Sequence, residues 1–132
     1  MTPFPLKIVT PDGIRFDGQA EELIVRTTTG DMGFLAGHVN CCAPLGMGRA
    51  MVVVDGVKRY GACIGGMVSV INGTVSLVPT TFEWAEDIDL ERAKTAQAEA
   101  QKKLESLDHQ DKDFAIMEAK LKRAIARINV KG

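Results

Sequence analysis

The sequence has almost no excess charge of either sign, and it has no long apolar run. Lys and Arg total 16 while Asp and Glu total 17, so the formal net charge is −1. The basic excess typical of nucleic-acid-binding proteins is therefore missing. The longest apolar runs have only a few residues, as in Met51–Val54, whereas a bilayer-spanning helix needs about 20 apolar residues. From the balanced charge and the short apolar runs we expect no nucleic-acid partner and no direct membrane insertion. The chain also opens with no basic-then-apolar leader, so we expect no export.

Cysteine is scarce, and its placement argues against disulfide bonds. The three cysteines are Cys41, Cys42 and Cys63, an odd number with two adjacent members. Such a set predicts no disulfide framework and suits a reducing cytosol. Free cysteines are usually buried, so we expect these to be small buried thiols.

Familiar catalytic signatures are missing as well. The chain holds no phosphate-binding GxxxxGK[ST] motif, no GxSxG, no HExxH and no CxxC. Its two histidines, His38 and His109, are far apart, and neither has a metal-ligand spacing. The acidic residues are mostly spread over predicted helix surfaces, where charges normally interact with solvent. We therefore predict no catalytic residue and no metal site in this chain.

The 132 residues divide into two parts by composition. All five prolines precede residue 80, and twelve of the thirteen glycines precede residue 74. Later residues are mostly Ala, Glu, Lys, Gln and Leu, without an internal breaker. We predict an α+β chain with a β-domain over residues 1–84 and a helical part over residues 85–132.

The first part has the pattern of short strands joined by tight turns. Asp55-Gly56 and Asn72-Gly73 each join two apolar runs, and both dipeptides favour two-residue hairpin turns. Thr10–Gly13 predicts a further turn. An antiparallel sandwich or flattened barrel follows from this pattern. The predicted strands are Leu6–Val9, Leu23–Thr27, Arg49–Val54, Val57–Ile64, Met67–Ile71 and Thr74–Val78.

The second part has the pattern of an antiparallel helical hairpin. Apolar residues recur three and four positions apart in two segments, which are joined by the polar residues 108–111. The first stripe is mostly alanine, and each Leu→Ala difference removes burial worth ~1–3 kcal/mol. We therefore expect a weakly held pair that can leave its packed position. The two stripes are Ala93, Ala96, Ala100, Leu104, Leu107 and Phe114, Met117, Leu121, Ala124, Ile128.

The segment Gly30–His38 combines three glycines with apolar and polar side chains. Its glycine spacing differs from that of a phosphate-binding loop. It fits either a loop that connects strands or a contact loop that presents Asp31 and His38 to a partner.

Three arginines of the helical part lack an obvious local explanation. Asp89 suits a helix N-cap, with Ile88 and Ala93 as a hydrophobic staple, but Arg92 then stands near the positive end of the helix dipole. Arg123 and Arg127 are four residues apart with no acidic partner on their own helix. The hairpin brings both back toward Arg92. The residues alone fit either a solvated basic face or a pocket for one anion.

These motifs, in this order, resemble the epsilon subunits of bacterial F-type rotary ATP synthases over essentially the whole chain. The resemblance implies a ten-stranded antiparallel β-sandwich followed by a two-helix hairpin. It implies a non-catalytic rotor subunit that couples proton flow to ATP synthesis and restrains ATP hydrolysis. The implied partners are the gamma subunit, the c-ring and, with the hairpin extended, the catalytic alpha and beta subunits, at the cytoplasmic face of the bacterial membrane.

The resemblance also implies an ATP site, with ATP (alone or with Mg²⁺) as a regulatory ligand rather than a required cofactor. Arg92, Arg123 and Arg127 would contact phosphates, while the other residues would surround the adenine or fix the site. By position, the implied ATP-binding residues are Glu83, Ile88, Asp89, Arg92, Ala93, Arg123 and Arg127.

Two further sets of contacts follow from the same resemblance. Asp31 and His38 match the loop that meets the c-ring and stalk. An extended hairpin would present a basic face to acidic segments of the catalytic subunits, made of Lys120, Lys122, Arg123, Arg127 and Lys131. An alternative reading of the chain is a free-standing nucleotide-binding adaptor with a helical arm.

Overall fold

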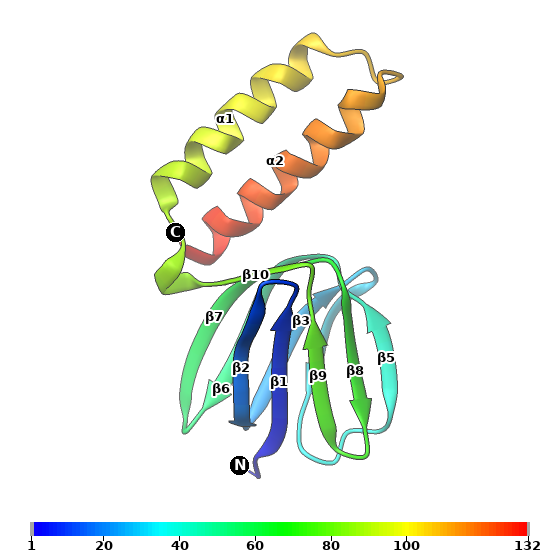
Figure 1. The fold of residues 1–132 in the computed structure, drawn as a ribbon, viewed down its shortest axis with the longest axis vertical. Coiled ribbons are helices and arrows are strands. Elements are labelled where there is room, and N and C mark those ends of the chain that lie inside the picture. Colours follow the sequence, from blue (N-terminus) through cyan, green and yellow to red (C-terminus); the bar gives the residue numbers. More distant parts are fainter. Residues whose placement is uncertain (1, 132) are drawn as a thin grey trace.

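The computed structural model describes residues 2–131 and shows a β-domain that carries a helical hairpin at one end (Figure 1). A short 3-10 helix, η1 (Ala85–Asp87), leads from the strands to α1 (Leu90–Ser106) and α2 (Lys112–Lys131). The strands are β1 (Phe4–Thr10), β2 (Gly13–Ala20), β3 (Glu22–Thr27), β4 (Gly30–Phe34), β5 (Cys41–Pro44), β6 (Met47–Val54), β7 (Val57–Ile64), β8 (Met67–Ile71), β9 (Thr74–Val78) and β10 (Thr81–Trp84).

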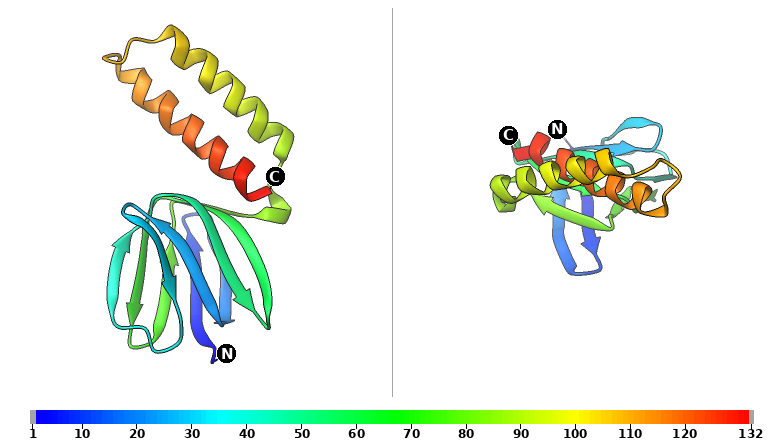
Figure 2. Two further views of the ribbon diagram at one scale, coloured as in Figure 1. Left: turned by 180° about the vertical axis from the view of Figure 1, so that it is seen from behind. Right: turned by 90° about the horizontal axis from the view of Figure 1, so that it is seen from above.

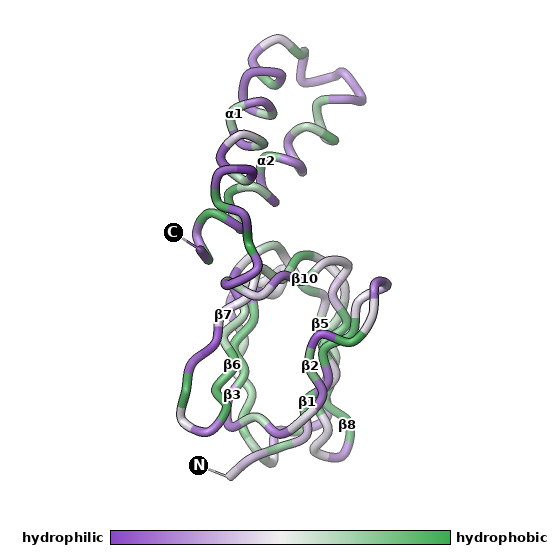
Figure 3. Tube along the Cα trace, turned by 60° about the vertical axis from the view of Figure 1, so that its left-hand side comes forward, coloured by the Kyte–Doolittle hydropathy of each residue, from purple (hydrophilic) through white to green (hydrophobic). Residues whose placement is uncertain are grey.

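The strands form two five-stranded sheets, in the orders β2-β1-β9-β8-β5 and β10-β7-β6-β3-β4. Figure 3 shows the two layers with the hairpin above them. This arrangement confirms the predicted sandwich followed by two helices. One pairing differs from the expected pattern, because β1 and β9 are parallel. The β8–β9 hairpin inserts between β1 and β5, so β9 runs beside β1 in the same direction.

The core lies between the sheets and follows from alternation along the strands. In β1, Phe4, Leu6 and Ile8 are buried, while Pro5 and Lys7 point outward and are exposed. Leu23, Val25 and Phe34 are buried from the opposite sheet. Successive residues of a strand face opposite sides, so this period of two places the apolar set inside the sandwich.

The predicted hairpin turns are confirmed by their backbone. Asp55 and Gly56 have φ values of 51° and 77°, and Asn72 and Gly73 have 49° and 81°, as a two-residue hairpin turn of this type requires. Gly66 is constrained more strongly: its φ is +90°, and a Cβ at this position would overlap the carbonyl oxygen of Val78. Only glycine fits there.

Four strands were missed in the sequence, namely β2, β4, β5 and β10. β2 is mostly exposed, so it lacks an apolar alternation. β4 contains two glycines, which depress strand propensity, and it takes up the first half of the segment Gly30–His38. β5 and β10 have only four residues each.

The expectation of three buried thiols is correct for Cys63 alone. Cys63 is buried, whereas Cys41 is half-buried and Cys42 is exposed. Cys41 and Cys42 lie on β5, an edge strand, where alternate side chains face solvent. Burial raises the pKa of the Cys63 thiol to about 12.

The hairpin projects from one end of the sandwich, with its turn far from the strands (Figure 2). α2 lies nearer to the sandwich and packs on β6 and β7. Small side chains of the predicted stripes are buried: Ala93 and Ala100 on α1, and Ala124 on α2. Ala126 is also buried, on the side of α2 that faces the sandwich. The thin alanine contact predicted from the sequence is therefore present.

The junction between the two parts is held by Trp84. Its ring lies edge-on to those of Phe16 and Phe82, and its indole N–H donates to the Arg15 carbonyl at 3.2 Å. The guanidinium of Arg59 covers the ring at 3.8 Å from its centroid and donates to Glu86 at 2.9 Å. Glu86 belongs to η1, so this cluster fixes the path from β10 into the helices.

Candidate functional site

The start of α1 forms as the sequence predicts. Oδ1 of Asp89 accepts a hydrogen bond from the backbone N–H of Arg92 at 3.1 Å, which confirms the N-cap. Ile88 and Ala93 are each only 4% exposed, as expected for a hydrophobic staple. The cap uses only the backbone of Arg92 and leaves its side chain exposed beside a cavity.

This cavity has a volume of about 470 Å³ and lies where β10, η1, α1 and α2 meet. It brings together five of the seven residues expected to bind ATP. It also includes Asp87 and Ala96, which the sequence analysis did not assign to a site. Its lining residues are Glu83, Asp87, Asp89, Arg92, Ala93, Ala96 and Arg127. We call it the junction cavity.

Glu83 and Arg127 form an ion pair across this cavity. Nε of Arg127 donates to Oε1 of Glu83 at 2.6 Å. The two side chains are 28% and 38% exposed, for Arg127 and Glu83 respectively, so the pair is partly shielded from water. The bond ties α2 to β10. Because it engages Nε, the terminal nitrogens of Arg127 have no hydrogen-bond partner within residues 2–131.

A second cavity of about 390 Å³ lies between the two helices, and we call it the interhelical cavity. Ala96 and Arg127 line both cavities, so the two adjoin. Arg123 lines the interhelical cavity and not the junction cavity. Its lining residues are Ala96, Glu99, Ala100, Lys103, Met117, Lys120, Arg123, Ala124 and Arg127.

The prediction that Ala96 packs in the helical seam is wrong. Ala96 is exposed, while Ala93 and Ala100 of the same stripe are buried. The methyl group of Ala96 is too short to fill the space beside Arg127, so the seam opens into the two cavities at this point.

The two cavities differ in charge. Three carboxylates and two guanidinium groups line the junction cavity, from Glu83, Asp87, Asp89, Arg92 and Arg127. In the interhelical cavity, four cations face a single carboxylate, that of Glu99. The interhelical cavity is therefore the more favourable place for phosphate oxygens, and its Lys103 and Lys120 went unassigned to ATP in the sequence. These two lysines lie on different helices, so only the packing of α1 against α2 shows that they line the same cavity.

Ile88 and the expected inhibitory face occupy separate places. Ile88 is buried and lines neither cavity. Lys120 and Arg123 face the interhelical cavity, while Lys122 lies 3.5 Å from Glu118 and faces the sandwich. Lys131 is exposed at the end of α2. In this docked position of the hairpin, the basic residues are spread over several sides of α2.

Asp31 and His38 lie near opposite ends of β4. Asp31 pairs with Arg26 at 2.8 Å, near the turn between β3 and β4. His38 follows the other end of β4, where its ring lies 4.9 Å from that of Phe34 and its Nδ1 is 2.8 Å from the Val39 carbonyl oxygen. The structure does not bring the two into one cluster.

A β-sandwich with a C-terminal helical hairpin is the class of protein that the fold defines, and family models match both parts. The ATP synthase delta/epsilon chain β-sandwich domain matches residues 3–85, and the delta/epsilon long α-helix domain matches residues 86–132. The chain belongs to the ATP synthase delta/epsilon family.

Curated relatives match over nearly their full length. An ATP synthase epsilon chain of Ruminococcus albus is 36% identical over 131 residues, covering 98% of this chain and 97% of the relative. An ATP synthase epsilon chain of Bacillus velezensis is 36% identical over 132 residues, covering 100% of this chain and 99% of the relative.

Solved structures agree on the fold. A chain in the Euglena gracilis mitochondrial ATP synthase, from a structure of OSCP, F1 and c-ring, has a TM-score of 0.82 at 25% identity, over 96% of this chain and 79% of that one. A chain of the Tetrahymena thermophila mitochondrial ATP synthase has a TM-score of 0.60 at 14% identity, over 96% and 92%. Within residues 2–131, neither helix has the length and apolarity needed to cross a membrane.

Proposed function

We propose that this chain is a rotor subunit in the central stalk of an F-type ATP synthase, at the cytoplasmic face of the bacterial membrane. Family membership over the whole length supports this role, as does the likeness to a chain solved with F1 and a c-ring. Its partners would be the gamma subunit and the c-ring, which Asp31 and His38 would contact. It would couple proton flow to ATP synthesis without a catalytic residue of its own.

We further propose that ATP binds across the junction and interhelical cavities. The observation that carries this proposal is that Arg127 lines both cavities while only its Nε is engaged by Glu83. Its remaining donors, with those of Arg92 and Arg123, suit phosphate oxygens because guanidinium groups bind them in bidentate fashion. Lys103 and Lys120 would add charge in the interhelical cavity.

The acidic side of the site would hold the rest of the ligand. Glu83, Asp87 and Asp89 line the junction cavity, where their oxygens can accept hydrogen bonds from the exocyclic amine of adenine or from ribose hydroxyls. Carboxylate oxygens also suit Mg²⁺, which commonly binds one or two carboxylates together with substrate phosphates. Ala93 and Ala96 would leave room for the ligand, and buried Ile88 would fix the start of α1.

ATP bound in this way would hold the hairpin against the sandwich. The junction cavity is built from β10, η1, α1 and α2 together, so it exists only while the hairpin is docked. The interhelical cavity requires α1 and α2 to be paired. A ligand shifts an equilibrium by its differential affinity for the two states. At a concentration 100 times its Kd, ATP would favour the docked state by about 2.7 kcal/mol.

Loss of ATP would permit the hairpin to extend and restrain ATP hydrolysis. The alanine-rich contact between α1 and α2 costs little to separate. An extended α2 would carry Lys120, Lys122, Arg123, Arg127 and Lys131 to acidic segments of the catalytic subunits. Arg127 would exchange its partner Glu83 for one of those carboxylates.

Calorimetry with ATP, with and without Mg²⁺, tests the nucleotide site. We expect saturable binding to the wild type and about tenfold or greater weakening in Arg92→Ala, since a charge-assisted hydrogen bond contributes about 1.5–3 kcal/mol. Lys94→Ala is the matched control, because Lys94 is an exposed cation on α1 that lines neither cavity. The absence of binding heat with all three proteins would reject the site.

Copurification from cells tests the rotor role separately. The proposal predicts that the chain is recovered in a tight complex with a gamma-like subunit. Recovery as a stable monomer would instead support the free-standing nucleotide-binding adaptor.

A further inference from the structure

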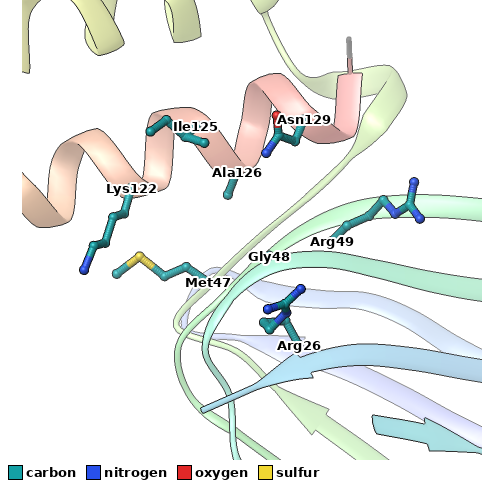
Figure 4. Close-up of a pocket in the computed structure, with 8 residues that line it drawn as sticks. All are labelled: Arg26, Met47, Gly48, Arg49, Lys122, Ile125, Ala126 and Asn129. Carbon is teal, nitrogen blue, oxygen red and sulfur yellow. The ribbon is translucent and has the colours of Figure 1, made fainter. Parts of the chain in front are cut away.

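A third cavity lies on a different side of α2, between this helix and the open end of the sandwich. Its volume is about 400 Å³, within the range of small-ligand sites. Its helix side comes from positions 122, 125, 126 and 129, which form one stripe of α2. The full lining, drawn in Figure 4, is Arg26, Met47, Gly48, Arg49, Lys122, Ile125, Ala126 and Asn129. We call it the docking cavity.

The docking cavity is lined by three cations and by no carboxylate among the residues that the structure describes. Arg26 pairs with Asp31 through Nε at 2.8 Å, which leaves its terminal nitrogens available. The guanidinium of Arg49 lies 4.5 Å from the Tyr60 ring centroid, and it has no carboxylate partner within residues 2–131. The lining is thus positively charged while the chain as a whole is not.

Small residues make room for this arrangement. A Cβ at Gly48 would lie 2.8 Å from Cβ of Arg26, so the absent side chain lets Arg26 lie over β6. On the opposite wall, Ala126 is buried and short. Figure 4 shows Asn129 above and Arg26 below the cavity, with Lys122 and Arg49 toward its two ends.

We propose that the docking cavity binds a linear polyphosphate anion. Arg26 and the Asn129 amide would donate to its central oxygens, and Lys122 and Arg49 would neutralise its ends. Guanidinium groups match phosphate oxygens in geometry as well as in charge. A nucleobase amine would find no carboxylate in this lining to accept its hydrogen bonds, and would face the apolar side chains of Met47 and Ile125 instead. The inorganic chain therefore suits this cavity better than a nucleotide.

The position of the cavity gives the anion a consequence for the hairpin. Arg26 and Arg49 belong to the sandwich, whereas Lys122 and Asn129 belong to α2. A polyphosphate that contacts both has its full set of donors only when the hairpin is docked, so its binding stabilises the docked position. This site shares no lining residue with the junction or interhelical cavity and does not depend on the ATP proposal.

Titration of the full chain with inorganic triphosphate, followed by amide NMR at constant ionic strength, tests this inference. The backbone amide of Gly48 and the side-chain amide of Asn129 report on the docking cavity, and the amide of Ala93 reports on the junction cavity. We expect saturable shifts at Gly48 and Asn129 that weaken about tenfold or more in Arg26→Gln, and likewise in Arg49→Gln.

Two controls separate this site from the ATP site and from general charge. Arg92→Gln removes a cation of the junction cavity and should leave the Gly48 and Asn129 shifts unchanged. Lys58→Gln removes an exposed cation of β7 that lines none of these cavities and should do the same. Unchanged shifts in both arginine variants of the docking cavity, no shifts in the wild type, or equal shifts with KCl at matched ionic strength would overturn the proposal.

Discussion

Glu83 and Arg127 stand 44 positions apart in the chain, yet a 2.6 Å ion pair joins their side chains. The pair links the last strand of the sandwich to the last helix, so it reports on whether the hairpin is docked. It also engages one nitrogen of the arginine that lines both the junction and the interhelical cavities.

Replacing Glu83 by Gln should loosen the hairpin. The partly shielded Arg127 would lose its charged partner, at a cost of about 1 kcal/mol to docking, and α2 would separate more often from the sandwich. Limited trypsin digestion measures this, because opened segments are cleaved in proportion to their population. We expect cleavage within α2 to accelerate several-fold. Glu118→Gln is the control, since Glu118 forms only an exposed pair with Lys122; equal acceleration in both would contradict the account.

Arg59 should govern the acid response of Trp84, which is the single tryptophan of the chain. The backbone N–H of Glu86, and then the Arg59 guanidinium, hold the pKa of the Glu86 carboxyl below its ordinary value of 4.5. Because this pKa is lowered, the ion pair between Glu86 and Arg59 is fully formed above pH 4.5 and is lost as the pH falls further. Tryptophan emission should therefore change in acid in the wild type.

In Arg59→Ala this acid transition should disappear, and the emission at neutral pH should shift to the red as the ring loses its cover. Arg15→Ala serves as the control, because the Arg15 contact with Trp84 uses the backbone carbonyl and survives the substitution. An acid transition that persists unchanged in Arg59→Ala would show that another group causes it.

Gly66→Ala should destabilise the sandwich more than Gly73→Ala. Both glycines have positive φ, which costs an alanine about 1–2 kcal/mol. At Gly66 the added methyl group also meets the Val78 carbonyl, whereas at Gly73 no atom lies within 4 Å. We expect the free energy of unfolding, measured in urea, to fall by about 1–3 kcal/mol more in Gly66→Ala than in Gly73→Ala. Equal losses of stability would mean that position 66 requires glycine only for its positive φ, and not for the close approach of the Val78 carbonyl.

The three thiols should differ widely in reactivity. Only a thiolate reacts with iodoacetamide, so Cys63, with its pKa raised to about 12, should stay unmodified at pH 8. Cys42 is exposed and should react first. The folded state holds the Cys63 proton more tightly than the unfolded state, so its contribution to stability is complete below about pH 9 and declines toward pH 12. Peptide mapping by mass spectrometry measures the labelling, and rapid labelling of Cys63 would contradict its burial.

Much of the fold could be predicted from local chemistry. The Asp55-Gly56 and Asn72-Gly73 turns and the Asp89 cap depend on residues adjacent in the sequence, so their signals are strong. The strand β4 could not be found in this way, because its glycines conceal it and it is defined only by pairing with β3. The parallel pairing of β1 with β9 is likewise a property of the assembled sheet.

The meeting of Arg92 and Arg127 at one cavity was predicted, whereas the division of the predicted residues between two cavities was not. Sequence reasoning could bring Arg92 and Arg127 to the same end of the hairpin. It could not separate the junction cavity from the interhelical cavity, since this separation depends on where Ala96 fails to fill the seam. Asp87 and Lys103 went unassigned for the same reason: neither belongs to a motif, and each reaches the site only through tertiary packing.

Hydrogen exchange at the amides of Ala124 and Ala126 tests most directly whether ATP holds the hairpin docked. Both residues are buried in the docked position, and a helix that loses its packing is only marginally stable in water, so separation of α2 should speed the exchange of these amides. With ATP and Mg²⁺ we predict slower exchange in the wild type by about tenfold or more at saturating ligand, and a smaller slowing in Arg92→Gln at the same ATP concentration. Equal exchange rates in the wild type with and without saturating ATP would contradict the account.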